Sequence, residues 1–145
     1  MNIETVLVPV DGTETSLDAA EYAISIANRY SASVHALYVL GEGISRGIHS
    51  GDLTRHDVAK DNEAFIEEMN AIGEGQDVHV RSSTAFGFST TRKSQHPGSV
   101  ILDCAEEVSA DFLVIPREQQ AGAADVLEKA AEYVLLYASQ PVLSV

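Results

Sequence analysis

The sequence has one cysteine, four prolines and no tryptophan. It also has no apolar run close to the ~20 residues that a membrane-spanning helix needs. A single cysteine excludes an internal disulfide. No basic and apolar segment followed by small residues begins the chain, so we expect no secretory leader. Together these absences predict a soluble, cytoplasmic protein without disulfides and without contact with a membrane.

Basic residues are scarce as well. Nine Lys and Arg stand against 22 Asp and Glu, which gives a formal net charge of −13. Such a surface repels the phosphates of nucleic acids, so we expect no nucleic-acid binding. The excess of acid suits a cytoplasm of high salt, where charges are screened over short distances, and it suits an acidic protein from an ordinary cytoplasm equally well.

Motifs that carry chemistry are missing too. The chain contains neither a GxSxG nucleophile turn nor a phosphate-binding P-loop. His49 and His56 are seven residues apart, which matches no established zinc pattern. His35 alternates with apolar residues and Cys104 lies among apolar residues at helical spacing, so we assign both to packing. We therefore predict no enzyme activity, no metal and no cofactor.

What is present is a regular alternation of strand and helix patterns over one domain, residues 1–145. Apolar or alternating runs predict strands at residues 3–10, 33–40, 77–86, 112–116 and 141–145. Helical patterns lie between them, and the last shows an expected inward stripe of Leu127, Ala131, Leu135 and Ala138. The pattern predicts an α/β fold with a five-stranded parallel open sheet and helices on both faces.

The last strand begins with Pro141, which favours a place at the edge of the sheet. A bare apolar edge invites aggregation unless another chain covers it. We therefore predict a homodimer, with antiparallel pairing of the final strand around a two-fold axis. The predicted interface consists of Val142, Leu143, Ser144 and Val145.

The segments VLVPVDGTETSLDAAEYAISIANRYSASVHALYVL, HPGSVILDCAEEVSADFLVIP and AAEYVLLYASQPVLSV resemble the opening, the middle and the end of universal stress proteins. The resemblance covers essentially the whole chain. It implies a Rossmann-like sheet in the order 3-2-1-4-5 and a homodimer formed through the last strand. It also implies a family in which some members bind ATP and others do not.

The ATP-binding members of that family carry Gly, two residues, Gly, nine residues, and then Gly followed by Ser or Thr. Glycines let backbone amides approach the phosphates, and the helix N-terminus favours their charge. Here the first two positions are Pro116 and Gln119. The third is Lys129 followed by Ala130 without a gap, or Glu128 followed by Lys129 with one deletion. Neither alignment restores the motif.

The resemblance thus predicts a universal stress protein that does not bind ATP, acting as an accessory or regulatory interaction module with an unknown protein partner. The alternative is a protein that binds a nucleotide or another anion through Asp11 and the altered loop at residues 116–127. In the ATP-binding relatives Asp11 would lie at the adenosine end, although an Asp after a strand also caps its own turn. The candidate ligand-binding residues are Pro9, Val10, Asp11, Val39, Pro116, Arg117 and Lys129. Residues 87–95 are predicted to form either a solvated loop or a site that contacts an anion, accepts phosphate or binds an acidic partner.

Overall fold

The computed structural model describes residues 2–41, 47–48, 50–52, 54–87, 96–116 and 126–145. Its sheet contains β1 (Thr5–Val10), β2 (Ser33–Leu40), β3 (Val80–Phe86), β4 (Phe112–Ile115) and β5 (Val142–Ser144). All neighbouring strands run parallel in the order β3-β2-β1-β4-β5. The predicted fold class and strand order are confirmed, and β3 and β5 form the two edges.

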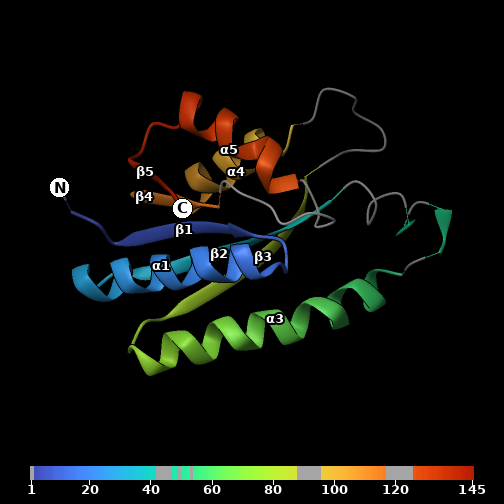
Figure 1. Cartoon of the computed structure of the whole chain (residues 1–145), viewed down its shortest axis with the longest axis horizontal. Helices are drawn as coiled ribbons and strands as arrows, with labels where there is room; N and C mark the ends of the chain where they lie inside the picture. Colours follow the sequence, from blue (N-terminus) through green and yellow to red (C-terminus); the bar gives the residue numbers. More distant parts are fainter. Residues whose placement is uncertain (1, 42–46, 49, 53, 88–95, 117–125) are drawn as a thin grey trace.

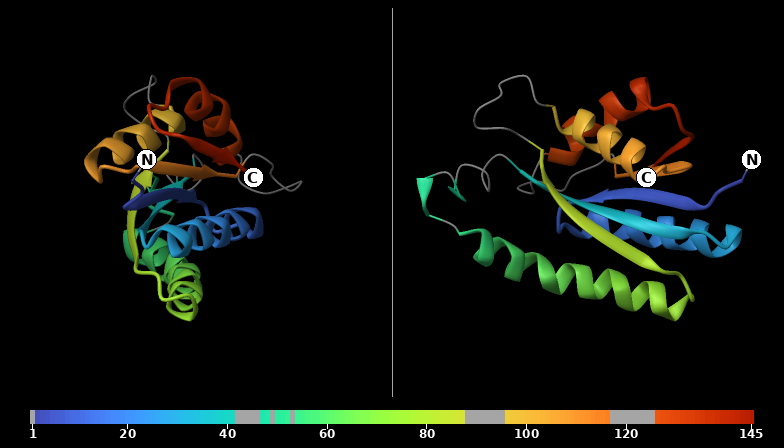
Figure 2. Two further views of the ribbon diagram at one scale, coloured as in Figure 1. Left: turned by 90° about the vertical axis from the view of Figure 1, so that its left-hand side faces the viewer. Right: turned by 180° about the vertical axis from the view of Figure 1, so that it is seen from behind.

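Helices cover both faces of this sheet. The structure has α1 (Glu14–Tyr30), α3 (Arg55–Gly75), α4 (Pro97–Glu107) and α5 (Val126–Tyr137). α1 and α3 lie on one face, and α4 and α5 lie on the other (Figures 1 and 2). Within the described residues, no helix is long and apolar enough to cross a membrane.

Local sequence signals set where these helices begin. α1 starts after Thr13, whose side chain accepts a hydrogen bond from the Ser16 amide. α3 starts after Thr54, which forms a capping box with Asp57. α4 has Pro97 in its first turn, where a missing amide hydrogen costs nothing. These caps fix the chain direction as it leaves each strand.

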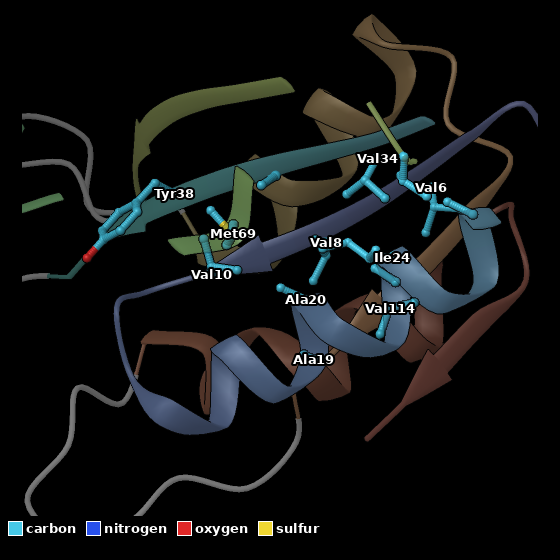
Figure 3. Packing of buried hydrophobic residues seen from close by; sticks show 14 of the residues in the cluster. Val6, Val8, Val10, Ala19, Ala20, Ile24, Val34, Tyr38, Met69 and Val114 are labelled. Carbon is cyan, nitrogen blue, oxygen red and sulfur yellow. The ribbon is translucent and has the colours of Figure 1, made fainter. Parts of the chain in front are cut away.

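The core has two layers, one on each face of the sheet. Successive residues of β1 point alternately into the two layers. Val6, Val8 and Val10 face α1, whereas Leu7 faces α4 and α5. Alanines of α1 lie against the first layer, which lets the helix approach the strands closely (Figure 3). Cys104 is buried in the second layer, as expected. Burial, followed by the charge of Glu107, raises the pKa of its thiol, so it stays protonated at neutral pH.

Two details of the sequence interpretation were wrong. Leu135 does not face the core of α5, because 52% of its surface is exposed. The buried residues of that helix follow a spacing of three, one and three: Leu127, Ala130, Ala131 and Val134. In addition β3 starts at Val80 rather than at residue 77, and its middle residues are exposed on both faces because this strand lies at an edge.

Candidate functional site

The predicted ligand-binding residues that the structure describes meet at the carboxyl edge of the sheet. Pro9 and Val10 end β1, and Val39 lies near the end of the neighbouring β2, where Val10 pairs with Tyr38. Pro116 directly follows β4 on the other side of β1. Ligands of open α/β sheets bind beyond the carboxyl ends of the strands, at the place where the strand order reverses. That place in this sheet lies between β1 and β4.

Most of these residues can offer a ligand only their backbone. Pro9, Val10, Val39 and Pro116 are buried. The side chain of Val10 belongs to the core under α1, and that of Val39 belongs to the core under α4 and α5. Arg117 lies outside the described residues, as does the side chain of Lys129. Asp11 is therefore the polar side chain of the predicted set that the structure places at this edge.

Asp11 is built into the turn that joins β1 to α1. Its Oδ1 accepts hydrogen bonds from the Thr13 amide at 3.2 Å and from the Thr13 hydroxyl at 2.6 Å. Its own amide donates to Ser16 Oγ at 3.2 Å, and the Ser16 hydroxyl donates to the Thr13 carbonyl at 2.9 Å. Ser16 is fully buried. The turn thus holds the carboxylate of Asp11 in one orientation.

The second oxygen of this carboxylate has no partner. Asp11 Oδ2 is buried, and no donor of the described residues reaches it. A buried acceptor without a hydrogen bond costs about 1–3 kcal/mol. One oxygen of Asp11 therefore serves the turn, and the other is available to a donor that comes from outside the turn.

Tyr38 completes this corner, and the sequence interpretation did not include it. The ring of Tyr38 is 8% exposed and packs edge-on against Phe65, with ring centroids 5.7 Å apart. Gly12 has a φ of 86°, and a Cβ at that position would collide with the Tyr38 hydroxyl. A tyrosine among the aliphatic residues at the end of β2 was the available signal. Gly12 is thus required both by its backbone conformation and by the closeness of Tyr38.

The other candidate sites are the two histidines, the loop at residues 87–95 and the dimer interface. His49 and residues 88–95 lie outside the described residues, and His56 is exposed on α3. In the part of the chain that the structure describes, no group of three His, Cys, Asp or Glu side chains could hold a metal ion. The four residues of the predicted dimer interface are half-buried, and the Val145 amide donates to the Ile115 carbonyl. The dimer itself stays a prediction.

The sequence matches a known protein family over nearly its whole length. The model of the universal stress protein family matches residues 2–145. The chain belongs to the universal stress protein family. Its sequence is 27% identical over 144 residues to a universal stress protein of Methanocaldococcus jannaschii. The alignment covers 97% of this chain and 80% of that protein.

Solved structures of universal stress proteins share the fold. The universal stress protein UspA from Lactobacillus plantarum superposes with a TM-score of 0.74 at 18% identity, over 100% of this chain and 99% of that one. A universal stress protein crystallised in complex with cAMP superposes with a TM-score of 0.67 at 22% identity, over 100% of this chain and 98% of that one. At these identities the likeness concerns the fold alone.

Proposed function

We propose that this universal stress protein does not bind ATP and acts as a dimeric accessory or regulatory module of a stress response, without enzyme activity. The observation that carries the proposal is Pro116. It is buried directly after β4, at the position where the ATP-binding relatives begin their phosphate loop. On this proposal the protein binds another protein and does not hold a triphosphate.

The physical argument concerns backbone donors. A phosphate at the end of a strand is held by amide N–H groups that approach it closely, which glycine permits. Proline has no amide hydrogen, and its ring fixes φ. In the sequence, Glu118 stands between Pro116 and Gln119, the first two positions of the altered motif, and adds a negative charge to that segment. Two like charges about 4 Å apart cost about 1 kcal/mol in water, and more when they are partly buried.

Restoring the motif tests this proposal. A variant with Pro116→Gly, Gln119→Gly, Glu128→Gly and Lys129→Ser regains the missing amide hydrogen at residue 116, the open glycine backbone and the hydroxyl. Calorimetry with Mg-ATP should give a saturable heat for this variant and none for the parent. A parent that binds ATP as well as the variant would contradict the proposal.

A second candidate function rests on the unpartnered oxygen of Asp11. A ligand that brings an N–H or O–H donor to the carboxyl edge would satisfy Asp11 Oδ2. Adenine amino groups and ribose hydroxyls are such donors, and a family member of the same fold binds cAMP. On this alternative the chain is a small-ligand binder that recognises the nucleoside rather than a chain of phosphates.

The second candidate predicts that adenosine or cAMP binds to the parent. Asp11→Asn should then weaken binding roughly tenfold to 100-fold, because a hydrogen bond to a charged group contributes about 1.5–3 kcal/mol. Glu14→Gln is the matched control, since Glu14 is an exposed acid in the same turn. Parent protein that takes up neither compound, or equal affinity in the Asp11→Asn variant, would reject the nucleoside site and leave the first proposal intact.

A further inference from the structure

A second polar cluster lies outside the Asp11 turn, on the face of β2 and β3 that α4 partly covers. His35 Nε2 and Ser83 Oγ are 2.8 Å apart. The register pairs His35 with Arg81, so His35, Arg81 and the residue two places further, Ser83, share one face of the sheet. Cys104 of α4 lies beside the Ser83 hydroxyl.

The state of His35 determines what this pair can do. Burial, followed by the positive charge of Arg81, lowers the pKa of the His35 imidazole, so the ring is neutral at neutral pH. In the tautomer with its proton on Nδ1, the neutral ring accepts a hydrogen bond from the Ser83 hydroxyl at Nε2. Of the other groups that face this pair, the Cys104 thiol carries no charge, because burial and Glu107 raise its pKa. His35 is therefore able to receive the proton of the serine.

Ser83 is also accessible. It is exposed in the middle of the edge strand β3, and no strand of the described residues pairs with the outer side of β3. A small reagent can reach its oxygen from solvent, whereas Cys104 is buried. Arg81, exposed on the same face and paired with His35 in the register, adds a positive charge to this part of the surface, which favours the negative charge that develops on a carbonyl oxygen under attack.

We propose that Ser83 is a site of self-acylation, at which its hydroxyl takes one acyl group from an activated acyl donor such as an aryl ester or a thioester. The Ser83 oxygen forms a bond to the carbonyl carbon while His35 Nε2 takes the hydroxyl proton. The bond from that carbon to the leaving oxygen or sulfur then breaks, and His35 returns the proton to the leaving group. The products are an ester at Ser83 and a phenol or thiol, with no change in oxidation state.

The pair is equipped for one transfer rather than for rapid turnover. Among the described residues His35 has Ser83 as its side-chain hydrogen-bond partner, and no carboxylate holds its Nδ1. Nucleophilic enzymes add such an orienting group and an oxyanion hole. We therefore expect slow, stoichiometric modification of Ser83, which would change the polarity of the exposed β3 edge.

p-Nitrophenyl acetate is the probe for this inference. The parent should release p-nitrophenolate as it gains one acetyl group, which peptide mass spectrometry should locate at Ser83. Ser83→Ala should remove that label, whereas Ser82→Ala should keep it, because Ser82 is an equally exposed neighbour on the other face of the strand. His35→Asn should slow labelling by at least about 100-fold, the lower end of what a general base contributes.

The pH dependence of the labelling rate shows whether His35 acts as a base or is only a structural neighbour of Ser83. Labelling should fall at acid pH as His35 takes up a proton, and Arg81→Gln should move the midpoint of that fall to higher pH, because it removes the charge that lowers the pKa of His35. Arg81→Gln therefore tests the role of His35 even if the His35→Asn variant does not fold. An acetyl group found on lysines, on His35 or on Cys104 in place of Ser83 would overturn the proposal. So would labelling of Ser83 that is independent of His35 and of pH.

Discussion

The two edges of the sheet differ in length and in polarity. β3 has seven residues, and Arg81, Ser82, Ser83 and Thr84 in its middle are exposed. β5 has three residues, all half-buried, and two of them are the apolar Val142 and Leu143. A polar edge strand can stay in water, whereas an apolar one needs a cover. The comparison suggests that association uses the β5 edge and that the β3 edge stays open to small molecules.

Changing the β5 edge should have the largest effect. Removal of Val142, Leu143, Ser144 and Val145 should convert the predicted dimer into monomer or aggregate, because it deletes the pairing strand. Analytical ultracentrifugation at micromolar concentration measures the change. Leu143→Lys should dissociate the dimer in the same way without shortening the chain.

The matched change at the other edge is Ser82→Lys, which leaves β5 untouched. It should leave the dimer intact, because β3 is exposed and polar. An intact parent that sediments as a monomer, or a dimer that Ser82→Lys dissociates, would contradict the comparison of the two edges.

Two glycines, one in a helix on each face of the sheet, extend the comparison from the edges to the packing of the helices. A Cβ at Gly98, at the start of α4, would lie within 2.7 Å of three atoms of Tyr133 on α5. A Cβ at Gly75, at the end of α3, would meet nothing within 4 Å. Gly98→Ala should therefore lower the free energy of unfolding by about 1–3 kcal/mol. Gly75→Ala should change it by no more than about 0.5 kcal/mol.

Urea unfolding of both variants, followed by circular dichroism, measures these values. Equal stability of the two variants would show that Tyr133 moves aside without cost. Its ring stacks on His96 at 4.6 Å and lies 4.7 Å from the ring of Tyr137, so any movement should disturb two further aromatic side chains.

Salt should have a smaller and more general effect. Pairing two copies at β5 brings together two chains with a formal charge of −13 each. Screening by KCl weakens that repulsion, so the dimer should become tighter and the melting temperature should rise from low to molar KCl. A flat or falling melting temperature would count against adaptation of this acidic surface to a salty cytoplasm.

The apolar periodicity was sufficient to predict the α/β class and the parallel sheet, and the resemblance to universal stress proteins supplied the strand order. The apolar run at residues 3–10 predicted a strand, and the helical pattern after it predicted a helix; β1 and α1 are both present. The phase of α5 was read wrongly because Ala130, Leu127 and Leu135 are all apolar, so hydrophobicity alone does not say which of them faces the core. Contacts with α4 and the sheet decide that.

The candidate site could be predicted only in part. Asp11 was proposed as a ligand-binding residue because of the resemblance to universal stress proteins, whereas its position after a strand predicted only that it caps its own turn. Its unpartnered Oδ2 and the closeness of Tyr38 to Gly12 depend on how β1 and β2 are aligned, which periodicity does not fix. The pairing of His35 with Ser83 was missed for the same reason, because these residues come from different strands.

The melting temperature in the presence of Mg-ATP tests the central claim most directly. A ligand at 100 times its dissociation constant adds about 2.7 kcal/mol to the stability of a folded protein. Because Pro116 supplies no amide hydrogen at the end of β4, millimolar Mg-ATP should leave the melting temperature of the parent unchanged. A clear, saturable rise of the melting temperature at micromolar Mg-ATP would contradict the account.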